Sequence, residues 1–245
     1  MVCKEANGVR LHILELDDLG PQMAARGVRF RDLFIDWLRP ALPEAVFSST
    51  LVPAGEALPE PGEYDAYMLT GSRAGVYDDL PWMQPLKDFV RMAARTGVPV
   101  GGVCFGHQIM AAAHGGLVEK ALGGWNIGRQ QHQVAAAARD LFGGADTLSA
   151  LSFHQDQVTR LPVDANVTVA SARSPHGGLR YDFPAMSVQF HPEFRPQTVT
   201  AMLDNARAGG PPAEVAAAAR ASLDGALDNA RIGLAFARFY RDALA

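Results

Sequence analysis

The chain has 245 residues, of which 48% are apolar and 20% are charged, and its formal net charge is −4, a composition typical of a globular protein with one sizeable hydrophobic core. The slight negative charge argues against binding to nucleic acid or to an anionic membrane surface, and no apolar stretch reaches the roughly 18 residues that a membrane-spanning helix needs. Two cysteines, Cys3 and Cys104, are too few for a disulfide scaffold, and the amino terminus lacks the pattern of a secretory signal, so we expect a cytoplasmic protein.

Short apolar strands alternate with amphipathic helices along the first half of the chain. In the segment 28–38, Phe30, Phe34 and Trp37 recur at spacings of three and four, which predicts one buried face of a helix. Such alternation with short connections is typical of an α/β fold, and we expect a flavodoxin-like, doubly wound sheet whose strands are mostly parallel. The expected strands are 9–16, 45–51, 64–70 and 98–103, and the expected helices are 28–38, one opened by Pro81 or Pro85, and 105–114.

Beyond residue 116 the pattern changes to short strands with few helices between them, which predicts a small antiparallel extension or a small second sheet. After Pro196 the chain is helical, and the Ala-rich run 211–245 carries apolar residues near helical spacing. We expect a single domain over 1–245, with a core at about 9–205 and a helical tail at about 206–245 that either caps the sheet or forms the face of a homodimer. The expected strands are 117–121, 131–138, 147–153, 167–170, 179–183 and 185–190.

The most informative segment is GVCFGHQ, at residues 102–108. Cys104 falls between a predicted buried strand and a predicted helix, at the carboxyl end of a parallel sheet, where ligands usually bind. Small residues on both sides permit the strained turn that presents a nucleophile, and the helix amino terminus favours the reactive thiolate. The N–H of Phe105 would then face an oxyanion formed at Cys104. Taken alone, however, this segment is explained better by a structural cysteine in a buried turn.

A second segment, VQFHPE at residues 188–193, supplies a partner for the thiol. His191 ends an apolar strand, and Pro192 holds the chain so that His191 and Glu193 share one face of the extended backbone. The carboxylate can then orient the imidazole, as in a triad of nucleophile, base and carboxylate. The pairing of Cys104 with these two residues makes the catalytic interpretation stronger than the structural one.

Together the two segments resemble the class I, or triad, glutamine amidotransferases, and the resemblance extends over about residues 9–205. In that family a cysteine attacks the side-chain amide of glutamine to give a γ-glutamyl thioester and ammonia, and water then releases glutamate. The resemblance implies that Cys104 is the nucleophile, His191 the general base and acid, and Glu193 the residue that orients His191. It also implies that Gln108 contacts the bound substrate, and we interpret His107 as part of the scaffold.

Two further segments are similar to parts of the family's site. TGSR at 70–73 stands where the family has a Gly-Gly-Pro-like loop with a backbone N–H in the oxyanion hole, so Gly71 and Ser72 are the expected donors beside Phe105. Ser72 and Arg73 depart from the family pattern, and Arg73 is either a cation at the mouth of the site or an ordinary solvated loop residue. SFHQDQV at 152–158 resembles the segment that holds the α-amino and α-carboxylate groups of glutamine, which implies main-chain contacts from Phe153 and His154.

Neither a cofactor nor a metal ion is expected, because no cluster of His, Cys and Asp has the spacing of metal ligands. The resemblance is strongest to stand-alone proteins described as GMP-synthase-like amidotransferases, through VYDD at 76–79 and RIGLAFARF at 231–239. Three functions remain open. The chain hydrolyses glutamine and passes ammonia to a separate synthase, or it is a γ-glutamyl peptidase that releases larger amines, or, in the least favoured case, it is a catalytically silent binding module.

Overall fold

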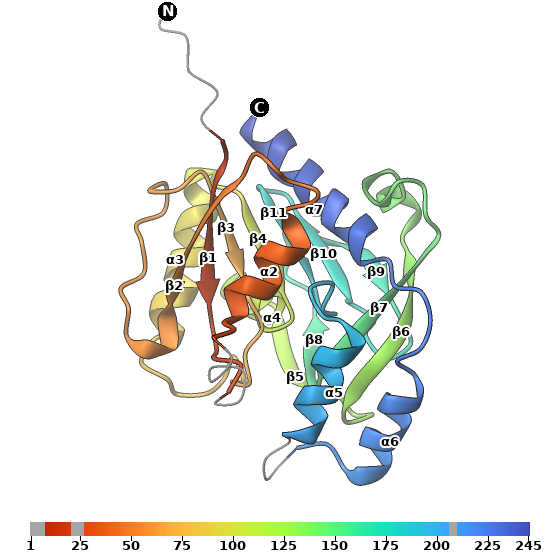
Figure 1. Ribbon diagram of the computed structural model, residues 1–245. Coiled ribbons are helices and arrows are strands. Elements are labelled where there is room, and N and C mark those ends of the chain that lie inside the picture. The colour runs from red at the N-terminus through yellow and green to blue at the C-terminus, as the bar shows by residue number, and fades with distance from the viewer. Residues whose placement is uncertain (1–7, 21–26, 206–209) are drawn as a thin grey trace, which may run out of the picture.

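The computed structural model describes residues 8–20, 27–205 and 210–245 (Figure 1). Cys3, with the rest of the amino-terminal segment, and the first residues of the predicted tail lie outside the described residues. None of the described helices is both long enough and apolar enough to cross a membrane.

Nine strands form one sheet in the order β2-β1-β3-β4-β11-β10-β9-β6-β7. In its first half, from β2 to β11, all strands run in the same direction, so their carboxyl ends lie at one edge (Figure 1). This order places β4, which leads to Cys104, beside β11, which leads to His191. The parallel strands are β1 (Arg10–Glu15), β2 (Val46–Leu51), β3 (Ala66–Leu69), β4 (Val100–Val103) and β11 (Ala185–Val188).

The second half of the sheet is antiparallel, and β5 and β8 form a separate antiparallel pair. The predicted fold class, a doubly wound α/β sheet with an antiparallel extension, is confirmed. The strand predicted at 131–138 is misplaced, because β6 starts earlier and ends at Val134, and Ala136–Ala138 form a 3-10 turn. β8 is not predicted by its pattern, since only Val158 of its residues is buried. The remaining strands are β5 (Leu117–Lys120), β6 (Asn126–Val134), β7 (Thr147–His154), β8 (Asp156–Arg160), β9 (Ala165–Ala170) and β10 (Gly178–Tyr181).

Helices cover both faces of the sheet (Figure 1). On one face α2 and α7 contribute Phe34 and Phe236 to a hydrophobic cluster, and on the other face α3 and α4 contribute Phe89 and Ile109 to a second cluster. Burial of these amphipathic faces against the sheet is what stabilises helices of this length. The helices are α2 (Phe30–Leu38), α3 (Met83–Thr96), α4 (Phe105–Ala113), α5 (Pro196–Asp204), α6 (Ala213–Ala221) and α7 (Asn229–Leu244).

The carboxyl-terminal helix α7 packs on the sheet beneath the strand that leads to Cys104. The Tyr240 hydroxyl donates a hydrogen bond of 2.9 Å to the main-chain oxygen of Tyr67 in β3. Gly101 in β4 leaves room for this hydroxyl, because a Cβ added there would collide with it. Helix α7 of the predicted tail therefore caps the sheet, and the expected homodimer stays a prediction.

Candidate active site

Cys104 occupies a strained turn between β4 and α4. Its φ of 54° and ψ of −104° make it the one described residue other than glycine with a positive φ. Such a conformation costs a bulky side chain roughly 1–3 kcal/mol, which the surrounding packing must offset. A Cβ at Gly102 would lie 2.5 Å from Met110 Sδ, and a Cβ at Gly106 would collide with the main-chain oxygen of Leu69. Both glycines are therefore required for the close approach that the turn needs.

His191 and Glu193 form a buried pair at the carboxyl end of β11. Nδ1 of His191 lies 2.7 Å from Oε1 of Glu193, and the two residues are 3% and 5% exposed. The His191 N–H also donates to the main-chain oxygen of Leu151 in β7, at 2.7 Å, so the antiparallel half of the sheet holds this turn in place. The imidazole lies flat against the ring of Phe194, with centroids 4.0 Å apart and planes 4° apart.

The charges around His191 favour its protonated form. Burial by itself lowers the pKa of His191, but the Glu193 carboxylate and the interaction with Cys104 outweigh burial and raise this pKa well above its ordinary value. The second carboxylate oxygen of Glu193, Oε2, is buried without a hydrogen-bond partner among the described residues, so His191 is the group that balances its charge. The imidazolium favoured in this way interacts directly with Cys104, the predicted nucleophile.

The predicted oxyanion side brings Gly71 and Phe105 toward the same place as His191. Phe105 is the first residue of α4, where an N–H has no acceptor within the helix and can face a ligand. A Cβ at Gly71 would stand 3.1 Å from Cε1 of His191 and 3.1 Å from Cζ of Phe30. The hydroxyl of Ser72 turns back to accept the N–H of Ala74, at 3.1 Å, and so holds the loop that carries the predicted donors.

Arg73 is tied down by two carboxylates. Its N–H donates to Asp17 at 2.7 Å, and its guanidinium donates to Asp17 at 2.6 Å and to Asp18 at 2.7 Å. These hydrogen bonds, the ones to Asp17 first, raise the pKa of Arg73. The N–H of Arg73 is therefore not a free oxyanion donor, and its charge anchors the loop after β3 to the segment after β1.

Two of the three predicted substrate-binding residues, Gln108 and His154, meet at the main-chain oxygen of Asp156. Gln108 donates from Nε2 to the Asp156 oxygen at 2.8 Å and to Oε1 of Gln189 at 3.2 Å. His154 is buried, and burial lowers its pKa to about 3, so its neutral ring donates from Nδ1 to the same Asp156 oxygen at 2.9 Å. Phe153, its neighbour in β7, packs its ring against Trp125, with centroids 5.9 Å apart.

His107 lies within the scaffold of the turn, as expected. Its side chain is fully buried, Nδ1 lies 2.9 Å from the Ser187 hydroxyl, and burial lowers its pKa to about 3. It points to β11 and has no hydrogen bond to His191 or Glu193.

Sequence reasoning missed three aromatic contributions to this site. Phe194 stacks on His191, Phe30 lies with His191 against Gly71, and the Tyr77 hydroxyl donates to Oδ2 of Asp156 at 2.7 Å. The last bond connects the loop after β3 with the segment that carries His154. Phe194 directly follows the HPE segment, and this adjacency was the one signal that could have identified it.

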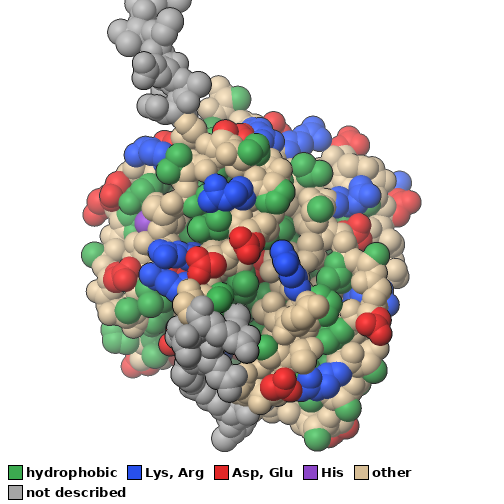
Figure 2. Space-filling model, in the orientation of Figure 1, with side chains coloured by type: hydrophobic (Ala, Val, Ile, Leu, Met, Phe, Trp, Pro, Cys, Tyr) green, Lys and Arg blue, Asp and Glu red, His purple; other side chains and the backbone are tan. Residues whose placement is uncertain are grey.

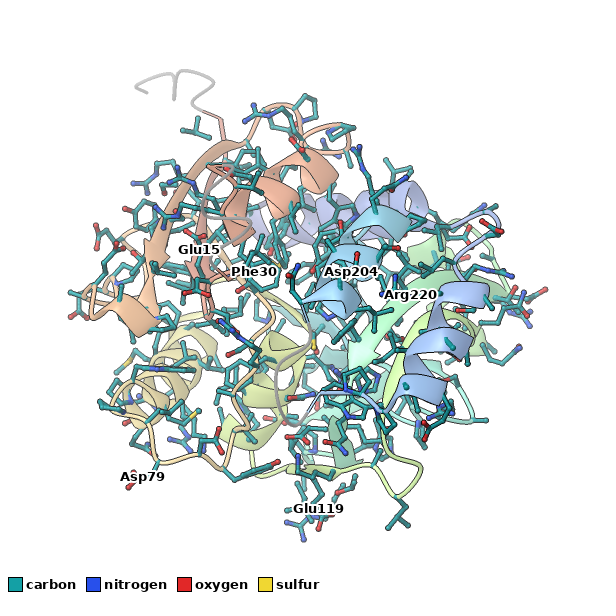
Figure 3. All side chains as sticks on the ribbon, turned by 60° about the horizontal axis from the view of Figure 1, so that its bottom comes forward. Glu15, Phe30, Asp79, Glu119, Asp204 and Arg220 are labelled. Atoms are coloured by element: carbon teal, nitrogen blue, oxygen red, sulfur yellow. The ribbon has the colours of Figure 1, made fainter. Side chains whose placement is uncertain are left out.

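A surface hollow borders Glu193. It has a volume of about 450 Å³ and lies between α2, the turn after β11 and α7, on the face shown in Figure 2. Trp37, Glu193 and Leu234 are among its lining residues, but Cys104 is not. The hollow therefore does not include the predicted nucleophile, which follows β4 at the carboxyl edge of the parallel strands, the edge that faces the viewer in Figure 3.

Two curated proteins match parts of the chain, and the matches cover different shares of their lengths. The chain is 26% identical over 148 residues to γ-glutamyl peptidase 3 of Arabidopsis thaliana, covering 58% of this chain and 59% of that protein. It is 37% identical over 130 residues to a glutamine-hydrolysing GMP synthase of Desulfotalea psychrophila, covering 51% of this chain and 24% of the synthase. The matches thus span about three-fifths and one-quarter of these relatives.

The fold and the family follow from two wider matches. The crystal structure of a glutamine amidotransferase from Thermotoga maritima aligns with 95% of this chain and 98% of its own, with a TM-score of 0.72 and 21% identity, so the two proteins share a fold. The family described as glutamine amidotransferase class-I matches residues 30–207. Because this match takes in well over half of the sequence, with the elbow at Cys104 and the His191–Glu193 pair inside it, the chain belongs to the class I glutamine amidotransferase family.

Proposed function

We propose that this protein is a cysteine-dependent hydrolase of γ-glutamyl amide bonds. The observation that carries the proposal is a cysteine in a strained turn at a helix amino terminus, next to a buried histidine that is paired with a carboxylate. Cys104 is the nucleophile, His191 the proton carrier, and Glu193 holds the imidazole by its Nδ1. This intact set of three residues argues against a silent binding module.

The reaction runs in two halves. The Cys104 thiolate adds to the amide carbon, and the N–H groups of Phe105 and of Gly71 or Ser72 stabilise the oxyanion. His191 then protonates the departing amine from Nε2, because its Nδ1 is committed to Glu193. In the second half His191 takes a proton from water, and the resulting hydroxide cleaves the thioester to release glutamate and the Cys104 thiolate.

The γ-glutamyl part of the substrate lies on the side of α4 and β7. Both amide hydrogens of Gln108 are already donated, so its Oε1 is left to accept a hydrogen bond from the substrate α-ammonium group. The main chain at Phe153 and His154 supplies the remaining polar contacts.

Glutamine is the simplest substrate that fits this chemistry, and the ammonia would pass to a separate synthase. The match to a glutamine-hydrolysing GMP synthase supports this candidate. A second candidate is a γ-glutamyl peptidase, which the match to a plant γ-glutamyl peptidase supports. Both reactions proceed through the same thioester and differ only in the amine that leaves.

The test is hydrolysis of glutamine and of γ-glutamyl anilide by the purified chain and by Cys104→Ala. We expect glutamate release from the parent protein and none from the variant, with the acylated enzyme detected by mass spectrometry in the parent only. Cys3→Ala, which removes the chain's other thiol, is the matched control and should keep its activity. Equal rates in the parent and in Cys104→Ala would refute the proposed function.

A further inference from the structure

We propose that Phe30 determines which amine can leave, by closing the leaving-group side of the site to anything much larger than ammonia. This inference rests on the proposed function and deepens it, because it selects amides with a small leaving group over γ-glutamyl amides of bulky amines. Phe30 is the first residue of α2, and only 5% of it is exposed.

The ring of Phe30 stands beside the group that handles the leaving amine. Cζ of Phe30 and Cε1 of His191 are each 3.1 Å from the position that a Cβ on Gly71 would take. The ring also stacks near Phe194, with centroids 6.4 Å and planes 22° apart, and Phe194 lies flat against His191. Phe30, Gly71 and Phe194 thus form an apolar wall at the imidazole, with Phe30 and Gly71 at its Cε1 edge and Phe194 on one of its faces.

That edge faces the leaving group and not the γ-glutamyl group. The departing nitrogen must come within hydrogen-bond reach of His191 Nε2, and Cε1 is the neighbouring ring atom. The glutamyl pocket lies toward β7 and α4, around Gln108, whereas Phe30 and Gly71 follow β1 and β3 on the opposite side of β4 in the sheet. Because the two substituents of the scissile bond diverge, a group carried by the leaving nitrogen would extend toward Phe30.

The wall is fixed by polar anchors at the start of α2. The Glu15 carboxylate, at the end of β1, accepts from the Arg29 guanidinium at 2.5 Å and from the Arg31 N–H at 3.1 Å. The Asp32 carboxylate caps the same turn by accepting the Arg29 N–H at 2.7 Å. In Figure 3, Glu15 and Phe30 lie next to each other in the middle of this edge of the sheet. With its backbone held on both sides, Phe30 is poorly placed to move aside for a bulky amine.

The experiment measures kcat/KM for glutamine and for γ-glutamyl p-nitroanilide in the parent, Phe30→Leu and Phe30→Ala. Although the anilide has the better leaving group, we expect the parent to have the higher kcat/KM for glutamine. In the two variants, kcat/KM for the anilide divided by kcat/KM for glutamine should rise at least about tenfold, which is the scale of a steric change in an apolar pocket. Phe47→Leu is the matched control, because it makes the same change at a ring away from Cys104 and His191. The Phe47 ring in β2 is half-buried, and its centroid lies 5.2 Å from Cζ of Arg39. The substrate ratio of Phe47→Leu should equal that of the parent.

The outcomes separate the two proposals. The role of Phe30 is overturned if the parent hydrolyses both substrates but prefers the anilide. It is also overturned if the ratio of kcat/KM values in both Phe30 variants equals that of the parent. Either result leaves the proposed function intact. A parent that releases glutamate from neither substrate and forms no acyl-enzyme overturns both. Phe30→Leu keeps most of the apolar volume, and the parent's own preference requires no variant, so a poorly folded Phe30→Ala would not spoil the test.

Discussion

Acidification from pH 7 to pH 5 should destabilise the protein through three buried histidines. Burial is the largest cause that lowers the pKa of His107 and His154 to about 3 and that of His132 to about 4, all from an ordinary value of 6.5. Each is at most 4% exposed, and both ring nitrogens of His132 lack a hydrogen-bond partner among the described residues. The folded state therefore keeps these rings neutral at a pH where the unfolded chain protonates them.

The size of the effect follows from proton linkage. Below pH 6.5 the unfolded chain binds more protons than the folded chain, so stability is lost as the pH falls from 6.5 toward the folded pKa values. At pH 5 each histidine costs about 2 kcal/mol relative to pH 7, or about 6 kcal/mol for the three. His191 acts in the opposite sense, because its raised pKa keeps it protonated in the folded state, and it returns about 1 kcal/mol over this range. A net loss of about 5 kcal/mol is a large fraction of the 5–15 kcal/mol that stabilises a typical domain.

The assay is urea denaturation at pH 7 and pH 5, followed by circular dichroism, for the parent and for His132→Leu. The ring of His132 packs against Phe190, with centroids 4.4 Å apart, so leucine offers an apolar substitute at an apolar contact. We expect the pH-dependent loss in this variant to be smaller by about 2 kcal/mol, the contribution of one histidine. Equal free energies of unfolding at the two pH values, or an unchanged loss in His132→Leu, would refute the reasoning.

Two substitutions test the site itself. Glu193→Gln keeps an acceptor for Nδ1 of His191 at a contact of 2.7 Å but removes the charge that raises the pKa of His191, so kcat/KM for glutamine should fall by about 10²–10⁴-fold. A loss of less than tenfold would contradict the role of Glu193. Tyr77→Phe removes the 2.7 Å hydrogen bond to Asp156, whose main-chain oxygen holds Gln108, and should raise KM about 2- to 10-fold with an unchanged kcat. A fall in kcat at constant KM would argue against this positioning role, and steady-state kinetics distinguishes the two results.

The fold class and the family were predictable because their signals are local in the chain. Apolar spacing in α2 and the short strand before Cys104 each depend on neighbouring residues, and they sufficed to predict an α/β sheet with a nucleophile elbow. The glycines at 102 and 106 were also readable as requirements for close approach. The structure adds which atoms they make room for, namely Met110 Sδ and the main chain of β3. The catalytic roles built on this elbow remain proposals.

The sequence by itself determined the strand-turn-helix at Cys104 and the two-residue spacing that joins His191 to Glu193, since both are properties of short segments. Only the tertiary structure decided what surrounds them: the β7 contact at His191, the aromatic wall led by Phe30, and the bond from Tyr77 to Asp156. These contacts join residues that are up to about 160 positions apart. Local propensity carries no information about such pairs, because burial of a whole sheet face and satisfaction of its polar groups bring them together only when the chain is folded.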